Sequence, residues 1–313
     1  MWRNASDHDR ALLERDGQFL HGAFYLGSPA FYDWLRDLDD DTRRGIDMRR
    51  VSEVNELYGG NETLERLQRR DARFFNSCMM ATALGAAVSD QLEDGRVVSG
   101  VGGQYNFVAM AHALPSARSV LMLRAVRAAR HGAQSSIVWN YGHATIPRHL
   151  RDLYISEYGI ADVHGKADED CIVAMASIAD ARFQDALVDD AKRNRKLRRD
   201  FVAPSTWTRN TPASLGARLA PFQADGTLPD YPLGSDFTDV EQHLVKALGW
   251  LKTNTASTGA KLRVLAHAFG AGATTDKEAL ARMRLEHPHS PGEWLEARLL
   301  SLALRATRSQ PAS

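Results

Sequence analysis

The sequence predicts an α/β protein with an open, mainly parallel sheet and a helical extension behind it. From about residue 20 to 204, short β-branched or aromatic runs alternate with amphipathic segments, as in chains built from βαβ units. Several runs are almost continuously apolar, which is typical of strands covered by helices on both faces. The alternation of strand and helix signals then ends, and a proline-containing linker at 205–236 leads to a helical tail at 237–313. With an N-terminal segment at 1–19, these are the expected domains.

The α/β part carries readable strand and helix signals. We expect strands at residues 23–27, 73–81, 96–101, 119–126, 135–140 and 152–159. Ser28 stands before a proline, and Asn61 stands before an amphipathic run, so each is expected to cap the start of a helix. After Gly165, residues 167–180 and 181–194 read as two successive helices.

The tail has its own helix signals but no cluster of reactive side chains. Capping boxes predict three helix starts, at Thr238 with Glu241, at Thr275 with Glu278, and at Ser290 with Glu293. Just before the linker, the basic run at 192–199 is either a solvated helix end or a contact for a phosphate group.

Composition excludes several classes of protein. The 313 residues carry 39 Lys and Arg against 39 Asp and Glu, so no global charge draws the chain to nucleic acid or an anionic membrane. The first residues are charged and no run of 18 apolar residues occurs, so we expect neither a secretory signal nor a membrane span. Cys78 and Cys171 are far apart, which suits a reducing cytoplasm and predicts neither a disulfide nor a zinc site.

The glycine cluster at Gly100, Gly102 and Gly103 is the most informative local feature. It follows a strand-like run and precedes an apolar, helix-compatible segment. Glycine costs about 0.5–1 kcal/mol relative to alanine in regular structure, so such a cluster needs a reason. One reason is a tight turn between a strand and a helix. The other is close approach of a phosphate, a thioester oxygen or a cofactor to the backbone, and the local sequence leaves both open.

Familiar site patterns do not fit this cluster. A dinucleotide-binding turn that starts at Gly100 would need glycine where Tyr105 stands, and no acidic residue follows about 20 positions later. A Walker A ending and a G-x-S-x-G motif are both missing. His143 and His149 lack the spacing of two ligands on one helical face, so we expect ordinary hydrogen-bonding histidines and no metal site. What remains is a turn whose free N–H groups stabilise an oxyanion.

Longer motifs carry a resemblance to a known family. The segments SGVGGQYNF (99–107), ISEYGIADVHGKADED (155–170) and ASIADARFQDAL (176–187) resemble the C-terminal domain of the acetyl-CoA hydrolase/CoA-transferase family, with VNELYG (54–59) and VSD (88–90) in the expected order. The match covers roughly residues 20 to 200. It implies a class I CoA-transferase-like fold and an enzyme that hydrolyses acyl-CoA, or moves CoA between carboxylic acids, through a glutamyl-CoA thioester.

The resemblance also implies site residues. Gly102 and Gly103 would offer backbone N–H groups to the reacting thioester, as the catalytic contacts of this chain. The residues expected to order the loop or touch CoA are Gly100, Gln104, Asn106, Arg127 and Arg130. Coenzyme A or acyl-CoA is expected as substrate, beside a small carboxylate, with no permanently bound cofactor.

The sequence departs from the family at the nucleophile. In relatives the reactive Glu lies upstream of the matching part, and no equivalent motif is found in this chain. Glu56 and Glu157 match other family positions and are expected to be structural acids. The chain is thus either the C-terminal part of a hydrolase or transferase, with little activity alone, or a noncatalytic CoA-binding module or remnant. A homo-oligomer and a separate N-terminal half are the expected protein partners.

Overall fold

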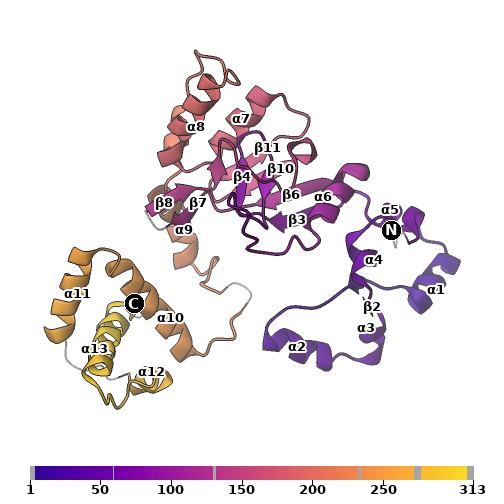
Figure 1. The fold of residues 1–313 in the computed structure, drawn as a ribbon. Helices are drawn as coiled ribbons and strands as arrows, with labels where there is room; N and C mark the ends of the chain where they lie inside the picture. Colours follow the sequence, from indigo (N-terminus) through magenta and orange to yellow (C-terminus); the bar gives the residue numbers. More distant parts are fainter. Residues whose placement is uncertain (1–3, 59, 130–131, 232–233, 271–275, 309–313) are drawn as a thin grey trace. The chain divides into compact units, whose positions relative to one another are not determined.

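The structure is a computed structural model, and it describes residues 4–58, 60–129, 132–231, 234–270 and 276–308 (Figure 1). The chain divides into two compact units. The first comprises Met1–Tyr25 and Leu38–Asp230, and the second comprises Leu26–Asp37 and Tyr231–Ser313. No helix in the described ranges is long and apolar enough to cross a bilayer.

The first unit opens with short elements. In chain order they are α1 (Asp7–Asp16), β1 (Leu20–Gly22), α3 (Asp40–Arg44), β2 (Ile46–Met48), α4 (Val51–Asn55) and α5 (Glu62–Gln68). The strands β1 and β2 pair in parallel. Asn61 caps α5 by accepting a hydrogen bond from the backbone N–H of Leu64, as predicted.

A four-stranded sheet organises the rest of the first unit. Its order is β11-β10-β6-β3, formed by β3 (Arg73–Ser77), β6 (Arg118–Met122), β10 (Leu153–Ser156) and β11 (Gly159–Asp162). β3, β6 and β10 run parallel, and β11 pairs antiparallel with β10. The parallel strands therefore share one edge at which they end, called here the carboxyl edge, and one at which they begin, the amino edge.

Helices pack on this sheet and close its core. They are α6 (Gln104–Ala113), α7 (Asp168–Ser177) and α8 (Ala181–Arg193), and Figure 1 shows α7 and α8 beside each other. α6 packs on β3 and β6, and α7 packs on β11. Tyr154 and Cys171 lie in one buried cluster with strand and helix residues. The α/β class and the mainly parallel sheet are confirmed.

The two faces of the four-stranded sheet are buried to different extents. On one face, Leu121, Tyr154 and Ala161 share a register row and are fully or almost fully buried. On the other face, Phe75 is 60% exposed and Ile160 is 64% exposed, although both are apolar. The second face is therefore a partly open apolar surface, called here the open face.

Smaller strands and connecting helices complete the first unit. They are β4 (Met80–Thr82), β5 (Ala87–Val88), β7 (Val126–Ala129), β8 (Gly132–Ser135), β9 (Ile137–Val138), the 3₁₀ helices η2 (Arg148–Leu150) and η3 (Ser205–Arg209), and α9 (Pro212–Ala224). β4 lies between β5 and β9, and β7 with β8 forms a hairpin.

The second unit is a helical cluster with its own core. It contains α2 (Pro29–Arg36), α10 (Asp239–Asn254), α11 (Thr258–Gly270), α12 (Lys277–Arg282) and α13 (Pro291–Ala306). Buried residues of α10, α12 and α13, among them Leu244 and Leu300, pack together. Figure 1 shows α10 to α13 gathered together.

The helix caps mostly follow the sequence signals. Ser28 caps α2, and the capping box of Thr238 with Glu241 is complete. Ser290 caps α13, but the Glu293 carboxylate accepts from the N–H of His289. Thr275 lies outside the described residues, and Asp276 supplies the cap of α12.

Two of the predicted strands are wrong. Residues 23–27 are irregular, and the strand β1 comes just before them. Residues 96–101 contain only an isolated bridge between Val97 and Gln91. Both runs have strand-forming side chains but lack a neighbouring strand to complete a ladder, which is what decides strand formation.

Candidate functional site

The glycine cluster forms a turn that leads directly into α6. Gly102 has φ +59°, a left-handed conformation that glycine adopts without strain, and Gly103 is the N-cap of the helix. Within the described residues, the backbone N–H groups of Gly100, Gly102 and Gly103 donate no hydrogen bond. The turn therefore presents free donors at the positive end of a helix dipole, an arrangement that suits an anion or oxyanion.

The segment before the turn is fixed by Asp90. Its backbone carbonyl accepts hydrogen bonds from the N–H groups of Val98 and Ser99. Its carboxylate accepts one from the Thr145 hydroxyl, and its Oδ1 lies 3.0 Å from Nε2 of His143. The hydrogen bond from Thr145, followed by the one from His143, lowers the pKa of Asp90. His143 is thus the ordinary hydrogen-bonding histidine that the sequence predicts, whereas the same prediction is wrong for the side chain of His149, which makes no hydrogen bond with any described residue.

The end of α4 lies against the glycine turn. A Cβ placed on Gly103 would come within 2.6 Å of the side-chain amide nitrogen of Asn55 and 3.0 Å of the Phe107 ring. A side chain at position 103 would therefore force Asn55 to shift. One residue on, Oε1 of Glu56 lies 3.4 Å from the Asn106 amide nitrogen, which donates to it. Both family-motif segments, 54–59 and 99–107, thus meet at the start of α6.

Gln104 joins this turn to the sheet. Its side-chain amide donates to the backbone carbonyl of Ser77 at 2.8 Å, at the end of β3. The side chain is only 6% exposed, and its Oε1 is buried without a hydrogen-bond partner. The start of α6 is therefore held at the carboxyl edge, where ligands of open α/β sheets commonly bind.

A cavity of about 710 Å³ opens at the same edge. The residues that line it come from the ends of the three parallel strands, and they are Ser77, Cys78, Met122, Leu123, Arg124, Ile155, Ser156 and Glu157. Ser77 thus lines the cavity and also accepts the bond from Gln104. We treat this cavity and the glycine turn as one candidate site.

Burial of Cys78 and a hydrogen bond to Glu157 bear on the reactivity of this cavity. Burial raises the pKa of the Cys78 thiol to about 12, so it stays protonated at neutral pH and is a poor nucleophile. Glu157 accepts a hydrogen bond from the backbone N–H of Ala125 at 2.8 Å. This contact gives the carboxylate the role of a structural anchor between β10 and the segment after β6.

Arg124 and Asn55 are the residues that the sequence analysis missed. Within the described part of the chain, Arg124 makes no hydrogen bond or ion pair, and it lines the cavity, as Glu157 does. The signal for Arg124 was its place directly after an apolar strand. Asn55 lies in the VNELYG motif, which was recognised only for its order in the chain.

Of the arginines predicted to contact CoA, Arg127 is not brought to this cavity. The Arg127 guanidinium bonds the carbonyl of Ser135 and the side chain of Gln134 within the β7–β8 hairpin. Arg127 is not among the residues that line the cavity. Arg130 lies outside the described residues. The contact of these two arginines with CoA stays a prediction.

The second motif segment is a bonded framework beside the site. The Tyr158 hydroxyl donates to Oδ2 of Asp180, and Arg182 donates to both oxygens of the same carboxylate. Asp180 is fully buried, and these bonds, with Arg182 first, lower its pKa. Burial, helped by the bond to Asp180, raises the pKa of Tyr158. This network fixes the start of α8 against the end of β10.

A family comparison decides the identity of this domain. Residues 27–191, just over half of the chain, match the family described as acetyl-CoA hydrolase/transferase C-terminal domain. The chain belongs to the acetyl-CoA hydrolase/transferase family. The matched range contains both the glycine turn and the cavity at the carboxyl edge.

Individual relatives match only in part. A 4-hydroxybutyrate coenzyme A transferase of Clostridium kluyveri is 25% identical over 119 residues, which are 38% of this chain and 28% of that protein. The structure of RipA from Yersinia pestis shares 24% identity with a TM-score of 0.47, over 57% of this chain and 38% of RipA. A 4-hydroxybutyrate CoA-transferase from Porphyromonas gingivalis shares 21% with a TM-score of 0.42, over 56% and 37%. The chain thus spans well under half the length of these relatives.

Proposed function

We propose that this chain supplies the thioester-binding part of a CoA-transferase or acetyl-CoA hydrolase reaction. The observation that carries the proposal is the link between two features, because Gln104 ties the free N–H groups of the glycine turn to the edge where the cavity opens. Family membership points to the same chemistry. Acyl-CoA is the proposed substrate, with water or a small carboxylate as acceptor.

The proposed catalytic contribution is electrostatic. When a carboxylate attacks the thioester carbonyl, negative charge builds on the carbonyl oxygen before the CoA thiolate leaves. The N–H groups of Gly102 and Gly103 would donate to that oxygen, because no other described group uses them. In other enzymes, removing one such donor lowers kcat about 100-fold to 1000-fold, and we expect a contribution of this size here. Gly100, Gln104 and Asn106 would hold the turn in place.

The nucleophile of the proposed reaction lies outside this chain. Cys78 is buried and protonated, and Oε2 of Glu157 accepts a backbone hydrogen bond, so we assign neither as the nucleophile. The cavity borders the open face, where Met122 and Ile155 are lining residues and also share a register row with the exposed Ile160. We propose that the N-terminal half of the family, carrying the glutamate, covers this face. The glutamyl-CoA intermediate belongs to that complete enzyme.

A noncatalytic CoA-binding module is the second candidate. The absence of a free nucleophile among the described cavity residues favours it for the isolated chain. Both candidates require acyl-CoA to bind, so binding is the first test of either.

The test is isothermal titration calorimetry of the 313-residue chain with acetyl-CoA. We expect saturable binding, and Arg124→Gln should weaken it about threefold to tenfold by removing a cavity cation near the CoA phosphates. The matched control is Arg96→Gln, an exposed residue that pairs with neighbouring Asp94. Failure of the unaltered chain to bind acetyl-CoA would contradict both candidates. If both variants weakened acetyl-CoA binding equally, the cavity would not be the acetyl-CoA site.

A further inference from the structure

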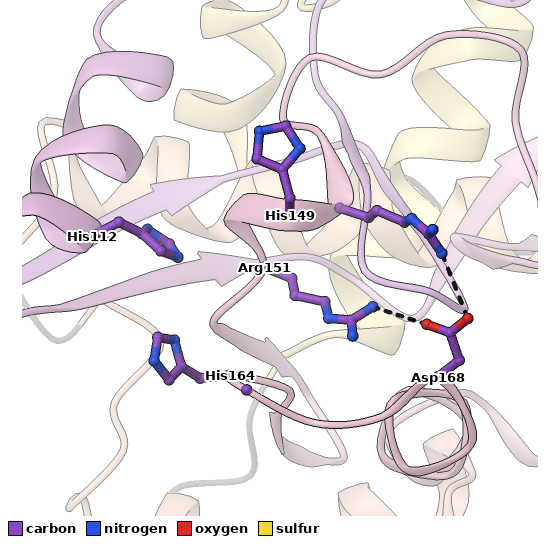
Figure 2. Close-up of a pocket in the computed structure, with 7 residues that line it drawn as sticks. His112, His149, Arg151, His164 and Asp168 are labelled. Carbon is purple, nitrogen blue, oxygen red and sulfur yellow. Dashed lines mark ion pairs between the residues drawn. The ribbon is translucent and has the colours of Figure 1, made fainter.

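A second cavity lies at the opposite edge of the sheet. Its volume is about 440 Å³, and the residues that line it are His112, Arg148, His149, Arg151, His164, Gly165 and Asp168. Figure 2 shows His112 and His164 close together on one side of it and Asp168 on the other, with Arg151 between them. The rings of the two histidines have their centres 5.8 Å apart.

Its place in the fold separates this cavity from the candidate site. Arg148 and Arg151 precede β10, whereas Glu157 follows it. His164 follows β11, whose last residue pairs with the first residue of β10. The helix α6 reaches from one edge to the other, with Gln104 at the carboxyl edge and His112 near its far end. The second cavity therefore lies at the amino edge.

The positive charges of this cavity are held in place. Arg151 donates to the backbone carbonyls of Leu84 at 2.9 Å and Lys166 at 2.6 Å, and its side chain is only 16% exposed. Arg148 is 57% exposed, and its guanidinium lies 3.6 Å from the Asp168 carboxylate, a distance longer than a hydrogen bond. Arg151 is thus a fixed cation, while Arg148 keeps most of its donors available.

The nearby acids also pair with cations that lie outside the cavity. Asp168 lies 3.0 Å from the Lys196 ammonium, and this hydrogen bond is the largest cause of its lowered pKa. Asp152, which is 3.8 Å from His164, accepts from Arg118 and from the N–H of Ser119. Asp168 also lines the cavity, 3.6 Å from both Arg148 and Arg151, but Lys196 pairs with it more closely, so the two arginines outweigh this carboxylate.

The histidines add ring nitrogens that have no hydrogen-bond partner among the described residues. Nδ1 of His112 lies 2.9 Å from the Val108 carbonyl, which leaves Nε2 available. His149 makes no hydrogen bond or ion pair with any other described residue. Arginine and histidine donors around a small cavity are the groups that recognise tetrahedral dianions.

We propose that the amino-edge cavity binds a small dianion of the phosphate or sulfate class, either free or as a phosphate ester. Arg151 and the paired acids form its fixed wall, and Arg148, His149 and His164 bind the ligand. The proposal stands on these contacts and does not depend on the function of the carboxyl-edge site.

Sulfate is the probe, because it stays dianionic across the working pH range. We expect the full chain to bind it saturably, with shifts of the His112 and His164 ring resonances in NMR spectra. Arg148→Gln and His164→Gln should each weaken binding about fivefold to tenfold, as expected for loss of one charge-assisted hydrogen bond. Arg96→Gln, which removes an exposed arginine elsewhere, is the control and should leave binding unchanged. No saturable binding, or equal losses in all three variants, would overturn the proposal.

Competition distinguishes the sources of the dianion. We expect neither CoA nor 3′-dephospho-CoA to displace sulfate from this cavity, whereas inorganic phosphate should displace it. Displacement by CoA but not by 3′-dephospho-CoA would assign the cavity to the 3′-phosphate of CoA and overturn a separate site. Displacement by both would overturn it as well.

Discussion

The glycine turn and the Tyr158–Asp180 network belong to the same family domain but are built in opposite ways. The turn is exposed, has a left-handed glycine at Gly102, and leaves its N–H groups without partners among the described residues. In the network, Asp180 is fully buried and each of its oxygens accepts hydrogen bonds. The difference separates a motif that is free to bind a ligand from one that stabilises the fold. The exposed donors of the turn can exchange water for a ligand, which is the role we propose for them, whereas the buried groups of the network already have partners within the protein.

The largest expected effect is on the turn. Gly103→Val forces a side chain against the Asn55 amide and the Phe107 ring, so it displaces the donors of the turn. We expect acyl-CoA turnover by the complete enzyme to fall at least about 100-fold, the scale of a lost oxyanion donor. Steady-state kinetics measures this loss, and thermal unfolding checks that the fold persists.

Gly216→Val is the matched control for that variant, because it places the same side chain on α9, outside the candidate site. A Cβ at Gly216 meets no heavy atom within 4 Å, and its φ is not in the left-handed range. Activity close to that of the unaltered protein is expected. If Gly103→Val also kept full activity, the cluster would be only a turn.

The next effect concerns stability in the network. Asp180→Asn removes the charge that Arg182 holds, and we expect unfolding free energy at neutral pH to drop by about 1–3 kcal/mol. Because the pKa of Asp180 is lowered in the folded state, its contribution is present above the unfolded carboxyl pKa of about 3.9 and is lost as pH falls through the folded pKa. The variant should therefore lose less stability than the unaltered chain between pH 4 and pH 2.

Urea unfolding at several pH values measures this difference. Asp185→Asn is the control, because this exposed residue lies on the same helix. An Asp180→Asn chain with unchanged stability but lost acetyl-CoA affinity would reverse the roles given to the two motifs.

Gln104 joins the open glycine turn to the hydrogen-bonded framework of the sheet. Its replacement therefore tests whether a residue between the two acts on the ligand or on the fold. Gln104→Met keeps the length of the side chain but removes the hydrogen bond to Ser77. It also removes the buried, unpartnered Oε1, which offsets part of the loss. We expect a stability change of less than about 1 kcal/mol and weaker acetyl-CoA binding, measured by urea unfolding and calorimetry. A large stability loss with normal binding would make Gln104 part of the framework alone.

The smallest expected effect on the ligand comes from the helical tail. Deletion of residues 237–313 removes α10 to α13 and their separate core, but none of the residues that line the carboxyl-edge cavity. We expect the melting temperature or solubility to fall while acetyl-CoA affinity stays within about twofold. Lost binding with unchanged melting would place a ligand contact in the tail.

The sequence predicted those features that local chemistry determines. Ser28, Asn61 and Thr238 cap helices as expected, and the glycine turn precedes a helix. The strand at 96–101 was wrong because strand formation needs a partner, which local sequence does not reveal.

The site was predicted less completely than the fold. The turn residues were found because glycines leave a local signal. Arg124 and Glu157 meet at one cavity only because β6 and β10 are neighbours in the sheet, and that depends on topology. The cavity at the amino edge also joins three distant segments, which contribute His112, Arg148 and His164.

The central claim is that this chain binds the thioester but lacks the nucleophile. The most direct measurement incubates the purified chain with acetyl-CoA and a labelled carboxylate, follows acyl exchange, and traps any enzyme thioester with borohydride. We expect no exchange and no label on Glu56 or Glu157 from the chain alone, and exchange once the N-terminal half of the family is added, with Glu157→Gln behaving like the unaltered chain. Robust exchange by the chain alone, with label on Glu157 that Glu157→Gln abolishes, would contradict the account.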